Sequence, residues 1–95
     1  MKKTYRLKCV RRDKKWEGTT CTYIITPIQT GLNAIQTHLH NNNFEGLVEF
    51  LVKEVEYEEA IFTLRGKKKY IQEAIHTLVC NTDLPNYFKI EERGF

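Results

Sequence analysis

Four basic residues stand together in the second half of the chain, at Arg65, Lys67, Lys68 and Lys69. The apolar pattern that follows them predicts a helix from about residue 67 to residue 80, so the lysines fall in its first turn. Positive side chains there face the positive end of the helix dipole, which disfavours them. A bound phosphate or carboxylate would relieve this repulsion and accept hydrogen bonds from the free backbone N–H groups. The pattern therefore predicts a contact for an anionic ligand, with a merely solvated helix start as the alternative.

A second basic block occupies the first 17 residues, which hold eight Lys or Arg against Asp13 and Glu17. The only tryptophan, Trp16, stands beside it. Such a combination suits single-stranded nucleic acid, because the ring stacks on a base while the cations neutralise phosphates. Packing of Trp16 over the edge of a sheet is the alternative. The two blocks give these candidate nucleic-acid-binding residues: Arg6, Lys8, Arg11, Arg12, Lys14, Lys15, Trp16, Arg65, Lys67, Lys68 and Lys69.

The residue types that bind metals are present but are not spaced to do so. Cys9, Cys21 and Cys80 lack the short C-x-x-C type of spacing found in zinc sites. His38 and His40 are two residues apart on a predicted helix, so their side chains point about 200° apart and cannot chelate one ion. We expect no metal site, and we interpret Cys9 and Cys21 as small apolar core residues.

Catalytic patterns are equally weak. His76 and Cys80 share one face of the second predicted helix, but the end of the dipole at Cys80 disfavours a thiolate nucleophile. The stretch Gly66-Lys67-Lys68 lacks the earlier glycine and the Ser or Thr of a phosphate-binding loop. We expect a protein that is not an enzyme and that needs no cofactor, although a site assembled from ordinary residues remains open.

Acidic residues cluster between the basic blocks. Residues 45–59 hold six glutamates against Lys53 alone. Four of them, Glu54, Glu56, Glu58 and Glu59, are too dense to indicate a tuned acid and base pair. We interpret this run as a solvated edge that discourages strand pairing.

Length and composition set the outer limits of the fold. Ninety-five residues, 41% of them hydrophobic and 28% charged, predict a single globular domain over residues 1–95. The basic residues near the start interrupt any apolar stretch that a secretory signal needs, and no run is long enough to span a membrane. The odd number of cysteines does not fit a disulfide framework, so we expect a cytoplasmic location.

The elements that must position these residues begin with two predicted strands. Residues 4–9 alternate strictly between polar and apolar, and residues 19–26 are rich in β-branched and aromatic side chains. A hairpin folded symmetrically about Lys15 would place Cys9 opposite Cys21 and would bring the two apolar faces together. This register makes the basic linker, residues 12–18, an exposed hairpin tip.

The rest of the chain divides into two helices and two or three strands. Thr26 is predicted to cap a helix with Pro27 in its first turn and Gln29 completing a capping box, and the asparagines at 41–43 end that helix. Residues 44–55 fit a helix and a strand equally well. Residues 60–64 predict a strand, residues 67–80 a helix that ends at Asn81 and Pro85, and residues 87–91 a last strand.

These elements predict an α+β fold with an antiparallel sheet and two helices on one face. If residues 46–54 form a strand, residues 19–92 follow the ferredoxin-like order βαββαβ, with an extra N-terminal strand that forms a β-hairpin. RNA-recognition modules share that order, but their aromatic motif has no counterpart in residues 59–64. The resemblance is one of topology only.

The leading functional hypothesis is a small regulatory protein that binds nucleic acid, RNA rather than DNA, through the basic hairpin and the basic helix start. The alternative is a protein-binding inhibitor or adaptor that meets an acidic surface on another protein. The Lys-, Asn- and Ile-rich composition is typical of an AT-rich genome and hints at a phage- or plasmid-encoded regulator.

Overall fold

The structure is a computed structural model that describes residues 2–12, 14–15, 23–24 and 26–93. Its fold is α+β, as the sequence predicts. The elements follow in this order: β1 (Lys2–Arg11), β2 (Lys14–Lys15), β3 (Tyr23–Ile24), α1 (Ile28–Asn41), β4 (Val48–Val55), β5 (Glu59–Lys67), α2 (Lys68–Cys80), α3 (Leu84–Tyr87) and β6 (Phe88–Arg93).

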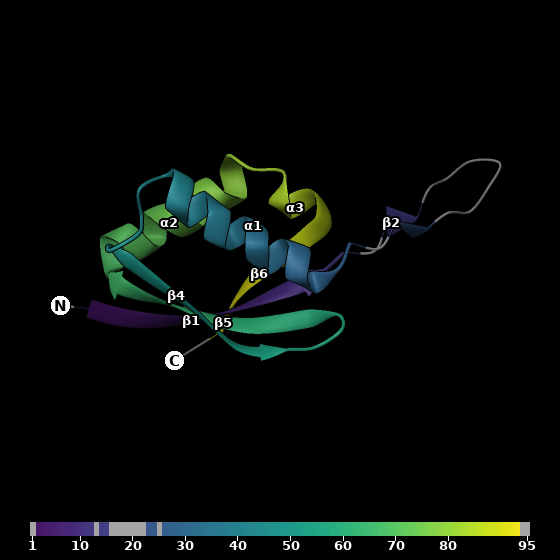
Figure 1. Ribbon diagram of the computed structural model, residues 1–95, viewed down its shortest axis with the longest axis horizontal. Coiled ribbons are helices and arrows are strands. Elements are labelled where there is room, and N and C mark those ends of the chain that lie inside the picture. The colour runs from purple at the N-terminus through teal and green to yellow at the C-terminus, as the bar shows by residue number, and fades with distance from the viewer. Residues whose placement is uncertain (1, 13, 16–22, 25, 94–95) are drawn as a thin grey trace.

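Four strands form one antiparallel sheet in the order β4-β5-β1-β6. Figure 1 shows the helices gathered on one side of this sheet and the short β2–β3 hairpin beyond the end of β1. Within the described part of the chain, no helix covers the other side of the sheet. No helix of that part is long and apolar enough to cross a membrane.

Alternation along the strands decides which side chains face the helices. In β1, Leu7 and Cys9 are fully buried while Arg6 is exposed. Leu7 lies opposite Phe62 of β5, which is also fully buried. These side chains meet the apolar stripes of α1 and α2 in a core that includes Ile28, Leu32, Ile35, Leu39, Ile71, Ala74 and Leu78.

One strand pairing predicted from the sequence is wrong. Cys9 lies opposite Ala60 of β5 and Ile90 of β6, and not opposite Cys21. Because β1 has a neighbour on both sides, neither of its edges is open to the 19–26 segment. Alternation fixes which face of a strand is buried, but it does not select the neighbouring strand.

The hairpin at the end of β1 also has a different register from the predicted one. Lys14 pairs with Ile24 and Lys15 with Tyr23 in a separate two-stranded sheet. Residues 16–22, which include Trp16 and Cys21, lie outside the described residues.

The strand that precedes α1 in the main sheet is β1 itself. The main-sheet elements and helices therefore run β1, α1, β4, β5, α2, α3, β6. The expected arrangement began at residue 19 and added residues 4–9 as an extra strand. This assignment is wrong, because β1 occupies the centre of the sheet and the described residues 23–24 lie outside it.

The predicted start of the first helix is also wrong in detail. Helix α1 begins at Ile28, with Pro27 at the capping position and no hydrogen bond from a capping side chain. The side chain of Gln29 donates instead to Asn33 at 3.0 Å. The predicted end is confirmed, since α1 stops at Asn41 and Asn43 adopts a left-handed conformation with φ of 61°.

The ambiguous segment 44–55 resolves into a turn followed by strand β4. Val48 of β4 lies opposite Gly66 of β5, and the register shifts between Val52 and Glu54, an irregularity of the kind that a β-bulge produces. The next strand, helix and last strand are confirmed near their predicted positions. The short helix α3 was not predicted, although Pro85 lies in its first turn.

Candidate nucleic-acid interface

The open face of the sheet is the side without helices, and β1 and β5 form its centre. It carries the even-numbered residues of β1 and the odd-numbered residues of β5, because the odd residues of β1 pack under the helices. Across this face the register sets Lys2 opposite Lys67, Thr4 opposite Arg65, Arg6 opposite Thr63, Lys8 opposite Ile61 and Val10 opposite Glu59.

Positive charge gathers at one end of the open face, which we call the basic end. Lys2 lies directly opposite Lys67, a like-charge pair that destabilises a sheet. Arg6 and Arg65 are diagonal neighbours on the paired strands, and the Cα atoms of such neighbours are about 7–8 Å apart. Neither arginine forms an ion pair with any described residue. The basic end comprises Lys2, Arg6, Arg65, Lys67, Lys68 and Lys69.

Helix α2 begins at the basic end, where the sequence places three lysines. Lys67 occupies the capping position and Lys68 and Lys69 open the helix, with no acidic residue in the first turn and no side-chain cap. The Lys69 ammonium lies 4.9 Å from the centre of the Tyr70 ring, a cation–π contact. Lys67 and Lys68 form no ion pair with any described residue.

Two hollows flank Arg65 on the surface. One, of about 280 Å³, is lined by Lys2, Leu47, Glu49 and Arg65 among others. The second, of about 170 Å³, lies further along the open face between Thr4, Thr63 and Arg65 on one side and the edge strand β4 on the other. Arg65 lines both hollows, and so does Glu49, which lies directly opposite Arg65 in the register.

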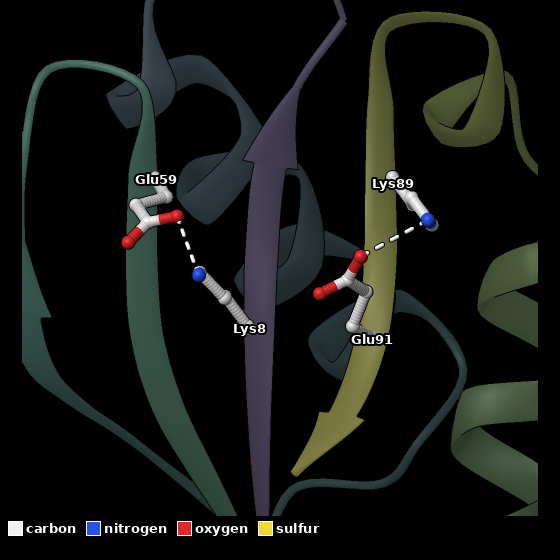
Figure 2. Close-up of polar contacts among 4 residues, drawn as sticks. All are labelled: Lys8, Glu59, Lys89 and Glu91. Atoms are coloured by element: carbon white, nitrogen blue, oxygen red, sulfur yellow. Dashed lines mark ion pairs between the residues drawn. The ribbon is translucent and has the colours of Figure 1, made fainter.

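In the far half of the open face, Lys8 and Lys89 each form an ion pair with a glutamate. The Lys8 ammonium lies 2.6 Å from a Glu59 carboxylate oxygen, and the Lys89 ammonium lies 3.0 Å from Glu91 (Figure 2). The Lys8 side chain is only 16% exposed. Lys8 is thus on the predicted face, but its charge is already paired with a carboxylate.

Arg11 is not a surface contact. Its odd position in β1 turns it under the helices, and only 9% of the residue is exposed. The guanidinium carbon lies 4.3 Å from the centre of the Tyr57 ring, and Nη1 donates to the Tyr57 carbonyl oxygen at 3.5 Å. Arg11 therefore ties β1 to the β4–β5 connection, which removes it from the predicted set of ligand contacts.

The two predicted basic contacts lie at opposite ends of the molecule. Figure 1 shows the β2–β3 hairpin at one end of β1 and the start of α2 at the other. Arg12 is exposed beyond β1, and its backbone N–H donates to the Tyr87 carbonyl at 2.8 Å. Lys14 and Lys15 lie in β2, and Trp16 lies outside the described residues. Strand β1 spans the roughly 30 Å between the two contacts.

Lys2 is the member of the basic end that the sequence analysis did not single out. Its place opposite Lys67 depends on the pairing of β1 with β5, which the sequence did not reveal. The signal that could have found it is the alternation itself, since Lys2 continues the polar series of Thr4, Arg6 and Lys8.

The described residues give little support for metal binding or catalysis. No group of three or more His, Cys, Asp or Glu there could hold a metal ion. Cys80 Sγ lies 3.7 Å from His76 Nδ1 on the exposed end of α2, whereas Cys9 is buried in the core. The comparisons of this chain with protein-family models, with curated proteins and with solved structures find no match.

Proposed function

We propose that this protein binds single-stranded nucleic acid, RNA rather than DNA, and acts by binding rather than by catalysis. The observation that carries the proposal is the basic end, which holds six Lys and Arg side chains from β1, β5 and α2, Arg65 among them. Such a concentration costs stability in the free protein and is relieved by a polyanion. A cytoplasmic regulatory role fits this chemistry.

The strand order supports the choice of surface. We propose that the fold belongs to the ferredoxin-like class. The order of β1, α1, β4, β5, α2 and β6 along the chain, βαββαβ, and the sheet order β4-β5-β1-β6 support this proposal. RNA-recognition modules with this order bind RNA on the open face of the sheet. The basic end of the present chain occupies the corresponding face.

The character of the open face limits how a strand can be recognised. Its described positions on β1 and β5 carry Lys, Arg, Thr, Glu59 and aliphatic side chains, and no aromatic ring on which a base could stack. Affinity should therefore come from phosphate contacts and should depend little on base sequence. The hairpin is predicted to contribute separately, by stacking Trp16 on a base.

Fluorescence anisotropy with a labelled single-stranded RNA at several salt concentrations tests this proposal. Replacing Arg6 and Arg65 with Gln should weaken binding and lower the slope of log affinity against log salt by about 1.4, or roughly 0.7 for each lost contact. Replacing Lys67, Lys68 and Lys69 with Gln should lower it by about two. Trp16→Ala should lower affinity with little change in slope.

Lys89→Gln provides the matched control, because it removes a basic residue whose charge is already paired with Glu91. It should leave affinity and salt slope nearly unchanged. Absence of salt-sensitive RNA binding by the unmodified protein at physiological ionic strength would contradict the proposal. The protein-binding inhibitor or adaptor would then be the better interpretation.

A further inference from the structure

The outer edge of strand β4 is open. β4 is a terminal strand of the sheet and pairs with β5 on one side, and no described residue pairs with it on the other. An edge strand of eight residues presents a row of backbone N–H and C=O groups that can pair with another strand.

Large apolar side chains follow this edge. Leu47, Leu51, Val52 and Val55 are 36–53% exposed, a higher exposure than their types usually have. Edge strands are commonly protected by a lysine and by a β-bulge, and β4 has Lys53 at its register shift. Lys53 disfavours pairing with most strands, but it favours one that sets a carboxylate opposite it.

We propose that β4 pairs antiparallel with β4 of a second copy of this chain, with the twofold axis at Leu51. In this register Glu49 lies opposite Lys53 of the second copy, and Lys53 opposite its Glu49. Glu49, Leu51 and Lys53 line the same hollow, so all three lie on the open face and the charges meet on one side of the joined sheets.

The charges select this register over its neighbours. Moving the axis by one residue sets Leu51 opposite Glu49 or opposite Lys53. Moving it by two residues sets Glu49 opposite its own copy or Lys53 opposite its own copy, and like charges directly opposite are destabilising. Only the axis at Leu51 gives two Glu–Lys pairs and an apolar centre.

The resulting dimer has one eight-stranded sheet, with the helices of both copies on the same side. The two open faces become continuous, because the axis runs perpendicular to the sheet. This proposal does not depend on nucleic-acid binding, since it rests on β4 and not on the basic end.

Sedimentation velocity on charge-exchange variants tests the pairing. Glu49→Lys and Lys53→Glu each turn both Glu–Lys pairs into like-charge pairs, so each should raise the dimer dissociation constant at least about tenfold. The double variant E49K/K53E restores opposite charges in every pair and should recover the dimer. Recovery is specific to this register, because the net charge of the double variant equals that of the unmodified protein.

Glu73→Lys is the matched control for Glu49→Lys, since it also replaces a glutamate with a lysine, at an exposed position on α2. It should leave the dissociation constant unchanged, and thermal melts should show that every variant folds. A protein that stays monomeric up to about 100 μM, where the association free energy would be weaker than about −5.5 kcal/mol, would overturn the proposal. Single variants that dimerise like the unmodified protein would overturn it too.

Cross-linking locates the axis independently. Directly opposite residues in an antiparallel pair have Cα atoms about 4.5–5.5 Å apart, within the range of a disulfide. With Cys21 and Cys80 replaced by Ser, Leu51→Cys should form a covalent dimer under mild oxidation. Val55→Cys should not, because the two copies of residue 55 would lie about 26 Å apart. Equal cross-linking at both positions would contradict the register.

Discussion

Burial sets the chemistry of Cys9. Its side chain lies fully inside the sheet beside Leu7 and Phe62, and burial raises the pKa of Cys9 to about 12. The thiolate, which is the reactive form, is therefore almost absent near neutral pH. Cys80, by contrast, is exposed at the end of α2.

We predict that a thiol reagent labels Cys80 in the native protein and labels Cys9 only when the protein unfolds. Peptide-resolved mass spectrometry after a short exposure measures both sites in one sample. Labelling in denaturant is the control, because both thiols then react. Rapid native labelling of Cys9 would contradict its burial under the helices.

His38 joins the two long helices. Thr77 donates through its hydroxyl to the Ala74 carbonyl, so His38 Nε2 donates to Thr77 Oγ1 at 2.9 Å. Asn42 then donates to His38 Nδ1 at 3.1 Å. Both contacts fit a neutral imidazole, and burial lowers the pKa of His38 below its ordinary value.

We predict that stability falls as pH drops below the ordinary histidine value of 6.5. The unfolded chain takes up a proton at His38 before the folded protein does, so the stabilisation is present above 6.5 and is lost as pH falls toward the lowered folded pKa. Urea melts between about pH 7.5 and about pH 5.5 measure the effect. His38→Gln should remove this component of the pH dependence, and an unchanged profile in that variant would contradict it.

At the scale of elements, the start of α2 works against the stability of its own helix. Lys68 and Lys69 open the helix without any acidic residue in the first turn. Each lysine there should cost about 0.3–1 kcal/mol through the helix dipole. An anionic partner bound at this helix start would offset that cost.

Replacing Lys68 and Lys69 with Gln should therefore raise the melting temperature slightly or leave it unchanged. Thermal melts at low salt measure this, and added salt should shrink the difference because it screens the charges. Lys89→Gln is the comparison, since it loses the ion pair with Glu91 and should give no gain. A clear loss of stability on replacing Lys68 and Lys69 would show that these lysines support the helix.

The β4–β5 pairing depends on a close approach at Gly66. A Cβ atom at this position would collide with the carbonyl oxygen of Leu47, a backbone atom that cannot rotate away. Gly66→Ala should cost about 1–3 kcal/mol, as overpacking usually does. Denaturant melts measure the loss. Thr63→Ala, on the open face of the same strand, should cost less, and an equal cost would contradict the steric reason.

At the scale of the whole molecule, the hairpin and the core are separate. The buried residues of the described core lie in β1 or between Ile28 and Phe88. Figure 1 shows the hairpin extending away from the sheet and the helices. The basic end and the hairpin can therefore be altered independently of each other.

Replacing residues 14–24 with a short Gly- and Ser-rich linker should leave the fold intact. Circular dichroism and a cooperative melt near the original temperature would show this. If the hairpin contributes to RNA binding, the same variant should bind more weakly while retaining the salt-sensitive contribution of the basic end. Loss of cooperative unfolding would instead show that the hairpin is needed for the core.

The sequence by itself determined the local features of this protein. Alternation in residues 4–9 predicted that Leu7 and Cys9 face the core, and the apolar spacing of residues 67–80 predicted helix α2. The lysines at its start were also evident from the sequence. These features depend on neighbours within a few residues, which a periodic pattern records directly.

Only the tertiary structure decided which strands are neighbours, and this changed the candidate site. The position of β1 between β5 and β6 buried Arg11, paired Lys8 with Glu59, and brought Lys2 and Arg65 to the start of α2. The segment 48–55 became a strand because β5 offered it a partner, while its own pattern fitted a helix equally well. Pairing between strands distant in the chain depends on the packing of the whole sheet, so no local pattern specifies it.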